Sequence, residues 1–354
     1  MILPLLALTL IGCAHAPTAA IHHAPDYDKV LVVENTASEA SKEIGGYYVK
    51  ARDIPSAHVL TISSSTDDDI SWTDYVSKIL KPVEAKLQGL PDIKYIVLTK
   101  GVPLRISEGG FSVDGELELA GNPVDEVQKA NGNQQSGPPN PYFDKDERFS
   151  HAKYGFYLVT RLDGYTVDDV KKLIDNSINP KREKGPFFFD TGASPGGGGY
   201  AHMHRTLVNA SAVLTAKGLN AETDQTAEFK APEEPLAGYA SWGSNDQHYS
   251  ADNYHKLRFK PGALAETFVS TSGRTFTHVT GGQSLIADLI AQGITGVSGH
   301  VSEPYTSGLI RPDVLFERYT SGSNLAESFY MASPMLKWKE VIIGDPLCSP
   351  YGKK

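Results

Sequence analysis

Cysteine is almost absent from this sequence: the 354 residues include only Cys13 and Cys348. Two cysteines cannot build the multi-bridge framework that stabilises small secreted domains, so the fold must depend on a hydrophobic core. The chain has 40% hydrophobic residues, which is enough for one large core or two smaller ones. If Cys13 is modified, Cys348 has no disulfide partner, and we expect it to be a small buried or half-buried residue.

A concentrated basic stretch is also missing. The formal net charge is -9, and the densest run of cations, Lys181 to Lys184, contains its own acid, Glu183. Nucleic-acid binding requires a Lys/Arg surface that neutralises phosphates. The sequence therefore argues against a nucleic-acid partner.

The N-terminus has an apolar run, residues 2 to 11, that is too short to span a bilayer but fits the hydrophobic region of a signal peptide. Leu10-Ile11-Gly12-Cys13 follows at once and resembles the lipobox of bacterial lipoproteins, which implies lipidation of Cys13. The absence of Asp after Cys13 resembles the pattern of lipoproteins sent to an outer membrane. A plain secretory signal cleaved after Ala14-His15-Ala16 is the alternative. We assign residues 1–13 to the signal peptide and 14–26 to a tether.

Strand and helix patterns alternate along the rest of the chain. Apolar runs predict strands, and three- or four-residue spacings of apolar side chains predict helices between them. Thr166 is expected to cap a helix, with Asp169 in the capping-box position. This alternation predicts an α/β fold with a mainly parallel sheet and helices on both faces. The predicted strands are 30–33, 59–62, 95–98, 157–160, 186–189, 263–269, 294–297 and 341–343, and the main predicted helices are 37–49, 72–87, 203–216, 286–291 and 324–331.

Periodicity stops between residues 107 and 151, a stretch that contains Gly109-Gly110 and an Asn/Gln/Gly/Pro-rich tract. A loop of this length within a compact domain is usually functional or disordered. We therefore divide the mature chain into an N-terminal α/β lobe, residues 27–180, with a long irregular insertion at about 107–151, and a second lobe, residues 181–350.

Two strand ends carry the most informative residues. One apolar run ends in Ser241-Trp242-Gly243-Ser244, and the next ends in Ser270-Thr271-Ser272-Gly273. The order of segments from Tyr27 to Leu347 resembles the catalytic domain of gingipain-type cysteine peptidases, which implies a caspase-like second lobe. In that family the first strand end carries a catalytic His and the second the nucleophilic Cys. Here these positions read Trp242 and Ser270 or Ser272, which implies a substituted dyad.

A narrower resemblance rests on several short motifs, which follow one another along almost the whole mature chain in the same order as in a bacterial family. They look like those of an uncharacterised bacterial family found in genomes that encode the exosortase sorting system, which implies an exported protein of the cell envelope but no established reaction. The motifs are Asn35 to Pro55, Lys100-Gly101-Val102-Pro103-Leu104-Arg105, Ser112-Val113-Asp114, Thr160-Arg161-Leu162-Asp163-Gly164, Glu303-Pro304-Tyr305 and Gly344-Asp345-Pro346-Leu347.

The residues at the two expected dyad positions determine whether peptide hydrolysis is possible. An indole has an N–H donor and no basic nitrogen, so Trp242 cannot act as the base that a nucleophile needs. A serine depends on such a base even more than a cysteine does, because its hydroxyl is not appreciably ionised at neutral pH. The competing enzyme hypothesis uses Ser270 or Ser272 with His300 and Glu303, whose segments all follow strand ends and should converge at one edge of the sheet.

We therefore expect a degenerate peptidase relative that binds a polypeptide or an envelope component, anchored to a membrane through a lipid on Cys13. The expected partner-binding residues are Trp242, Ser244, Asn245, Glu303 and Tyr305. The alternative is an active hydrolase or peptidase with the serine, His300 and Glu303. We expect no cofactor and no metal, since no acidic run has EF-hand spacing and His202 and His204 point in different directions on a helix start.

Overall fold

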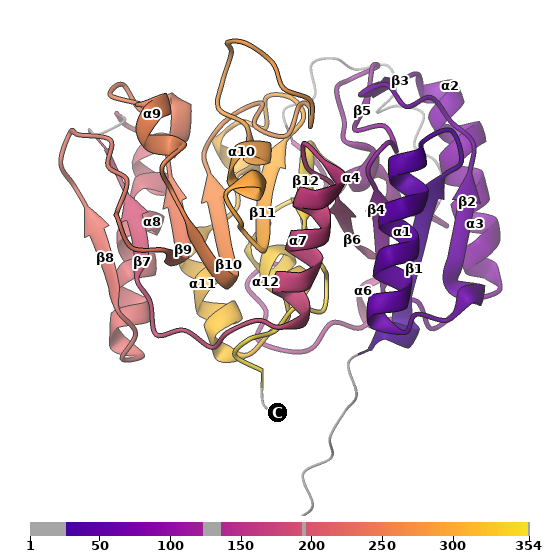
Figure 1. Ribbon diagram of the computed structural model, residues 1–354, viewed down its shortest axis with the longest axis horizontal. Helices are drawn as coiled ribbons and strands as arrows, with labels where there is room; N and C mark the ends of the chain where they lie inside the picture. Colours follow the sequence, from indigo (N-terminus) through magenta and orange to yellow (C-terminus); the bar gives the residue numbers. More distant parts are fainter. Residues whose placement is uncertain (1–25, 123–135, 193–195, 353–354) are drawn as a thin grey trace, which may run out of the picture.

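The computed structural model describes residues 26–122, 136–192 and 196–352. Its centre is a single ten-stranded sheet with the order β2-β1-β4-β6-β12-β11-β10-β9-β7-β8, and a two-stranded sheet, β3-β5, lies apart from it. Helices cover both faces of the large sheet (Figure 1). The α/β class with a large, mainly parallel sheet is confirmed, and the two expected lobes share this one continuous sheet.

The N-terminal half contributes four strands to the large sheet. Its elements are β1 (Val30–Asn35), α1 (Glu39–Arg52), β2 (Val59–Ile62), β3 (Asp69–Ile70), α2 (Trp72–Tyr75), a π-helical turn η3 (Val76–Leu80), α3 (Lys81–Gln88), β4 (Tyr95–Thr99), β5 (Arg105–Ile106), α4 (Val113–Glu118), α6 (His151–Tyr154), β6 (Leu158–Leu162) and α7 (Val167–Ile178), with short 3-10 turns η1 (Tyr27–Lys29) and η2 (Ser56–His58). The predicted strands at 30–33, 59–62 and 95–98 and the predicted helix 72–87 are present, and Thr166 and Asp169 form the predicted capping box.

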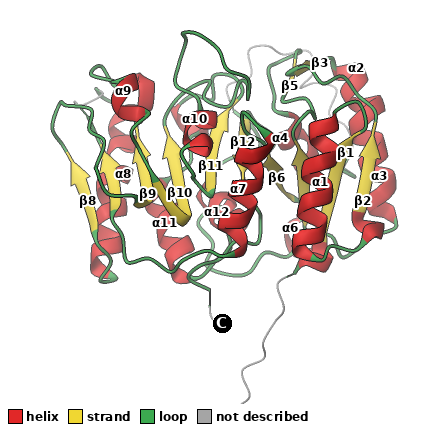
Figure 2. Cartoon of the chain, in the orientation of Figure 1, coloured by secondary structure: helices red, strands yellow, loops and turns green. Residues whose placement is uncertain are grey.

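The second half contributes six strands. Its elements are β7 (Phe187–Asp190), α8 (Gly199–Ala216), β8 (Ala221–Asp224), β9 (Leu236–Ser241), η4 (Gly243–Asn245), α9 (Ala251–Tyr254), β10 (Phe259–Thr267), α10 (Ile286–Ala291), β11 (Gly296–His300), η5 (Thr306–Gly308), α11 (Pro312–Ser321), α12 (Leu325–Ala332) and β12 (Glu340–Ile343). Figure 2 shows the alternation of helices and strands. The sequence patterns above did not predict β8 and α11, a polar edge strand and a short helix.

The hydrophobic core of the first half consists of two clusters, one on each face of the sheet, because side chains alternate along each strand. Val30 and Val32 pack with Ile44 and Tyr48 of α1, whereas Leu31 and Val33 belong to a separate cluster with Tyr75, Ile79 and Val83 of the α2–α3 helix. Successive side chains of a strand point to opposite faces, so a run of four buried apolar residues requires cover on both. The continuous apolar run in β1 therefore follows from its position inside the sheet.

The expectation of a long irregular segment at 107–151 needs correction. Its described part contains α4, and all six residues of α4 are buried. Ser112 begins this helix by accepting a hydrogen bond from the Gly115 N–H (2.9 Å). Apolar periodicity does not reveal α4 because three of its six residues are Asp114, Glu116 and Glu118, whose burial depends on partners distant in sequence.

Asp114 belongs to a buried ionic cluster around Arg161, which is 0% exposed. The Arg161 guanidinium donates to Asp114 Oδ1 (2.5 Å) and to the carbonyls of Val102 (2.7 Å) and Pro103 (2.9 Å), and Lys100 pairs with Asp163 (3.2 Å). Residues from three of the short motifs thus contact one another. The structure explains these motifs as fold-stabilising contacts between α4, β6 and the segment after β4.

The Gly344-Asp345-Pro346-Leu347 motif has a similar structural role. Asp345 is fully buried and accepts hydrogen bonds from Tyr48 Oη (2.9 Å) and Arg52 Nε (2.7 Å) at the C-terminal end of α1. The single C-terminal thiol, Cys348, is also buried, 3.5 Å from Tyr319 Oη. Burial raises the pKa of this thiol to about 12, so it is protonated and unreactive at neutral pH.

Long-range hydrogen bonds align the two halves of the sheet at one edge. The halves meet where β12 pairs with β6 through the residues Ile343 and Arg161. Lys100, after β4, donates to the Phe276 carbonyl in the loop after β10 (3.2 Å), and Arg105 donates to the Val301 carbonyl after β11 (3.1 Å). The carboxyl ends of β4, β10 and β11 therefore lie on the same edge, which we call the carboxyl edge.

The described chain begins at the opposite edge, because Tyr27 lies just before β1 and stacks against Arg52 at the end of α1. Figure 1 shows both ends of the described chain at this lower edge. No helix within the described residues is both long and apolar enough to cross a membrane. Cys13 and residues 14–25 of the tether lie outside the described residues.

Candidate functional site

Trp242 and the serine turn follow adjacent strands. β9 and β10 are parallel, with Ser241 in register with Thr267, and the Phe268 N–H donates to the Ser241 carbonyl (2.9 Å). Trp242 therefore lies at the carboxyl end of β9 and residues 270–272 at the carboxyl end of β10. Ligands of open α/β sheets bind at this edge, which makes it the candidate site.

The indole of Trp242 is enclosed. Its residue is 3% exposed, with the Phe268 ring packed edge-on (centroids 4.9 Å apart) and the Tyr200 ring stacked on it (5.7 Å). Its Nε1 is buried and has no hydrogen-bond acceptor among the described residues. Tyr200, in the first turn of α8, covers the indole of Trp242, which the sequence suggested as a partner-binding residue.

The two candidate serines differ in exposure, and Ser272 lies on the opposite side of β11 from the His300 ring. Ser270 is half-buried, whereas Ser272 is fully buried and its Oγ is 3.5 Å from the Val269 carbonyl. A Cβ built on Gly299 would be 2.8 Å from Ser272 Oγ, so Ser272 lies on the Gly299 side of β11. Because side chains alternate along a strand, the His300 ring points to the other side. The described structure does not form a Ser272–His300 pair.

His300 is 0% exposed, and burial lowers the pKa of its imidazole to about 4, with the carbonyls of Val269 and Gly308 opposing this shift. Neither ring nitrogen makes a hydrogen bond of good geometry with a described residue. The ring is neutral at physiological pH. An enclosed, weakly basic imidazole is poorly suited to accept a proton from a serine at the surface.

His300 belongs to a buried polar cluster that the sequence did not reveal. Glu266 of β10 accepts a hydrogen bond from Ser298 Oγ, and Glu340 of β12, in register with His300, accepts one from Ser333 Oγ (2.9 Å). Burial raises the pKa of Glu266 well above its usual range and that of Glu340 to about 8. Glu340 is therefore mainly protonated at neutral pH, and burial favours the neutral form of Glu266 as well. In the local sequence, this cluster is indicated only by Glu266, an acid inside the apolar run 263–269.

Ser244 and Asn245 connect loops of the protein itself. Ser244 Oγ accepts from the Ser284 N–H (2.9 Å), Asn245 Nδ2 donates to the Phe268 carbonyl (2.7 Å), and Gln283 Nε2 donates to Asn245 Oδ1 (2.9 Å). These bonds join the loop after β9 to the loop after β10. Both residues therefore have a positioning role in this structure.

Glu303 and Tyr305 are exposed at the same edge. Tyr305 has φ +58° and ψ 164°, a region that is populated almost only by glycine, and its N–H donates to Glu303 Oε1 (2.9 Å). A strained tyrosine that is 43% exposed is unusual, since strain is normally relieved unless the surroundings or a function maintain it. The Lys339 ammonium lies 5.9 Å from the centre of the Tyr305 ring.

Large exposed hydrophobic side chains gather at this edge. Among the described residues they are Tyr200, Val279 and Tyr305, which are 50%, 50% and 43% exposed, and each lies in a segment that follows the carboxyl end of a strand. The segments of Tyr200 and Tyr305 touch, because a Cβ on Gly199 would be 2.1 Å from Thr306 Oγ1. Gly199 therefore permits this close approach. Clustered exposed apolar side chains mark interaction sites more often than scattered ones do.

Asp190 adds a titratable group at the carboxyl end of β7. It is 1% exposed, and burial raises its pKa to about 7, with Asp246 and Asp224 acting in the same direction and a hydrogen bond from the Gly192 N–H (3.0 Å) opposing them. Within the described ranges, no group of three or more His, Cys, Asp or Glu side chains is arranged to hold a metal ion.

This strand order, with helices on both faces, matches the caspase-like fold of gingipains. The crystal structure of the Arg-specific cysteine proteinase gingipain R matches with a TM-score of 0.54 and 12% identity, covering 91% of this chain and 78% of that chain. The complex of the pro- and mature domains of Porphyromonas gingivalis RgpB matches with a TM-score of 0.52 and 13% identity, covering 91% and 79%. No protein-family model and no curated protein matches the sequence. The similarity establishes the fold.

Replacing Trp242 by Ala should destabilise the protein by about 3–5 kcal/mol, because it removes a buried indole from between Phe268 and Tyr200. Urea unfolding monitored by circular dichroism measures this change. Ser270→Ala is the matched control and should change the free energy of unfolding by less than about 0.5 kcal/mol. Equal stabilities of Trp242→Ala and the wild type would contradict the enclosed position of the indole.

Glu340→Gln should stabilise the protein increasingly as the pH rises from about 4.5 to about 8. In this window the unfolded carboxyl ionises while the folded one, with a pKa of about 8, stays protonated, so the wild type loses up to about 1.4 kcal/mol per pH unit relative to the amide. Unfolding free energies at pH 5, 6.5 and 8 measure this difference. Glu303→Gln, at an exposed neighbour, should show no such trend, and a pH-independent effect of Glu340→Gln would refute the buried neutral carboxyl.

Proposed function

We propose that this protein is a peptidase-fold binding protein that holds a polypeptide segment of an envelope component at the carboxyl edge without cleaving it. The observation that carries the proposal is the enclosed Trp242 at the end of β9, where the resemblance to gingipains predicts the catalytic base. An indole cannot accept a proton, so this position supplies packing instead of general-base chemistry.

The other groups of the edge support the same conclusion. Activation of Ser270 or Ser272 requires a base within about 2.6–3.2 Å, and His300 lies on the opposite side of β11 from Ser272, enclosed and neutral. Glu303, the third member of the hydrolase alternative, has its Oε1 in a hydrogen bond to the Tyr305 N–H. These contacts favour the binding hypothesis over the hydrolase.

Tyr200 and Tyr305 offer the contact surface that the binding hypothesis requires. Tyrosine combines a large apolar ring with one polar group and dominates many protein interfaces. Glu303 is exposed next to Tyr305, and the Lys339 ammonium lies 5.9 Å from the centre of the Tyr305 ring, where burial lowers its pKa. The surface thus provides aromatic anchors with a charge of each sign nearby, which suits a polypeptide segment with mixed side chains.

We further propose that the protein is exported and anchored through a lipid on Cys13, in the outer membrane or another envelope membrane. The lipobox-like sequence and the resemblance to the exosortase-associated family support this compartment. The described chain begins at the edge opposite the carboxyl edge. An N-terminal anchor would therefore leave Tyr200 and Tyr305 facing away from the membrane.

Tyr305→Gly should weaken partner binding while leaving the fold as stable as the wild type or more stable. Glycine relieves backbone strain of about 1–3 kcal/mol and loses about 1 kcal/mol in chain entropy, whereas the loss of an anchoring ring should cost more than ~1 kcal/mol of binding. The partner is captured from the native envelope, identified by mass spectrometry and titrated by calorimetry against each variant. Thermal unfolding reports stability in parallel.

Tyr47→Ala is the matched control, because it removes a half-buried tyrosine from α1, away from the carboxyl edge. It should leave the dissociation constant unchanged. If Tyr47→Ala and Tyr305→Gly weakened binding equally, the edge would not be the interface. Partner cleavage that Ser270→Ala abolished would establish the hydrolase instead.

The lipid anchor has a direct test. Intact-mass analysis of the protein isolated from its native membrane should give a chain that begins at Cys13 and carries a diacylglyceryl group and an N-acyl chain, which together give stable membrane attachment. Cys13→Ser should release the protein from the membrane fraction. A mature chain that began at Pro17 without lipid would show an ordinary secretory signal and remove this part of the proposal.

A further inference from the structure

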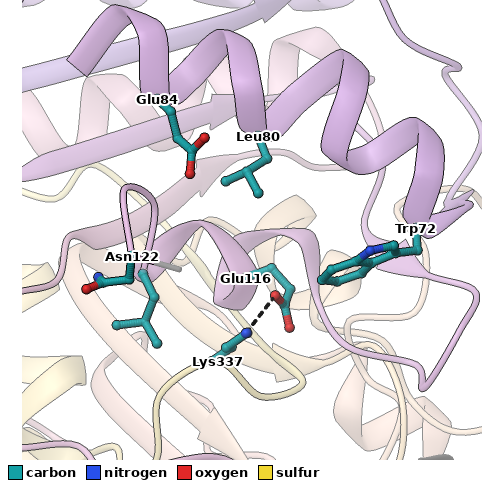
Figure 3. A pocket seen from close by; sticks show the side chains of 7 residues that line it. Trp72, Leu80, Glu84, Glu116, Asn122 and Lys337 are labelled. Carbon is teal, nitrogen blue, oxygen red and sulfur yellow. Dashed lines mark ion pairs between the residues drawn. The ribbon is translucent and has the colours of Figure 1, made fainter. Parts of the chain in front are cut away.

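The lysine just before β12 is buried at the carboxyl edge without an ion pair. Lys339 is 9% exposed, and no described residue accepts a hydrogen bond from its ammonium or carries a carboxylate within ion-pair distance of it. Lysine is rarely buried unless it is paired. Lys337, two residues earlier, follows this rule, since its ammonium pairs with Glu116 Oε2 at 3.5 Å (Figure 3). Lys339 therefore stands out as a buried cation that lacks an acceptor.

Two aromatic rings flank the Lys339 ammonium. Its nitrogen lies 4.7 Å from the centre of the Trp338 ring and 5.9 Å from the centre of the Tyr305 ring. The faces of such rings attract a cation, but they offer its N–H groups no oxygen acceptor. Unlike the indole nitrogen of Trp242, the Lys339 nitrogen is not sealed from solvent. A ligand can therefore reach the ammonium beside the exposed Tyr305 ring.

The two rings are held in place by the loop after β11. The Trp338 indole N–H donates to the Pro304 carbonyl (3.0 Å). A Cβ built on Gly308 would be 2.9 Å from Trp338 Nε1, so this loop packs tightly against the indole. The same loop holds Tyr305 in its strained conformation, with the ring near the Lys339 ammonium. The walls of the site are thus formed before any ligand binds.

The charge of Lys339 is only partly balanced by its surroundings. Burial lowers the pKa of its ammonium, and the Glu303 carboxylate opposes this shift from beyond ion-pair distance. Glu303 is exposed to water, and its Oε1 accepts the hydrogen bond from the Tyr305 N–H (2.9 Å). The ammonium thus loses hydration without gaining an ionic hydrogen bond in return. An anion with oxygen acceptors supplies what this position lacks.

We propose that Lys339 binds one carboxylate of the polypeptide segment held at the carboxyl edge, with the alkyl part of that acid packed on the Tyr305 ring. This inference rests on the proposed function and names the group of the partner that the edge recognises. The N–H donors of an ammonium match carboxylate oxygens, and charge-assisted hydrogen bonds of this kind are strong. A neutral amide leaves the ammonium unpaired, and Glu303 disfavours a phosphate dianion at the same place.

The carboxylate can belong to an acidic side chain or to a C-terminus, and the test separates these sources. The full-length protein is titrated with three N-acetylated tripeptides: an amide with a central glutamate, its glutamine counterpart, and trialanine with a free C-terminal carboxylate. The indole N–H signal of Trp338, assigned with Trp338→Phe, is followed by NMR. We expect the preferred acid to bind saturably with a dissociation constant on the order of millimolar. The tighter of the two acids identifies the source.

The glutamine peptide should bind at least about tenfold more weakly than the preferred acid, because its amide cannot balance the ammonium. Equal binding of the acids and the glutamine peptide would overturn the proposal. So would the lack of a saturable shift of the Trp338 signal up to about 50 mM of either acid.

Lys339→Met tests the cation itself, since methionine keeps much of the apolar stem and removes the charge. It should weaken binding of the preferred acid at least about tenfold and leave the thermal unfolding temperature unchanged or higher, because an unpaired buried charge is lost. Lys50→Met, at an exposed position in the last turn of α1, is the matched control and should change neither quantity. Glu303→Gln should tighten binding, because it removes a competing negative charge. Unchanged affinity in Lys339→Met would refute the proposal.

The carboxylate site and the proposed function fail in different ways. If Tyr305→Gly weakened binding of the captured partner while Lys339→Met did not, the edge would remain the interface and the carboxylate inference would be wrong. If the acid peptide bound through Lys339 while neither variant altered partner binding, the carboxylate site would stand and the polypeptide partner would bind elsewhere.

Discussion

The buried pairing of Arg161 with Asp114 is the interaction on which the N-terminal half depends. A guanidinium without exposure is stable only if its donors are satisfied, and here Asp114 and two carbonyls of the segment after β4 accept them. The pair fixes α4 against β6 although 47 residues separate the partners in sequence. Once α4 is fixed, Glu116 and Glu118 hold the segment before β12 through their contacts with Lys337.

The carboxyl edge of this caspase-like fold carries both enclosed and exposed aromatic side chains. The parallel pairing of β9 and β10 brings Trp242 and the serine turn to neighbouring strand ends. A catalytic base must be accessible to the substrate, whereas burial of the apolar surface of an indole stabilises the folded protein. The Tyr200 ring covers the indole of Trp242. Tyr200 and Tyr305 are themselves exposed, so they form the aromatic surface of this edge.

The buried acids beside His300 show how the sheet tolerates ionisable groups. Glu266, Glu340 and His300 lie on neighbouring strands, and burial shifts the pKa of each toward its neutral form. Three neutral groups avoid the large cost of an unpaired buried charge. Their neutrality explains how polar residues can occupy a sheet position that the sequence pattern assigns to apolar side chains.

The sequence by itself determined the elements that depend on local patterns. Buried strands such as β1 and β4 follow from continuous apolar runs, the start of α7 follows from Thr166 and Asp169, and the order of motifs indicated the caspase-like fold. Tertiary structure alone decided that α4 is a helix, that Tyr200 covers Trp242, and that His300 points away from Ser272. Periodicity and capping act within a few residues of chain, whereas these outcomes depend on partners that only the packed sheet brings together.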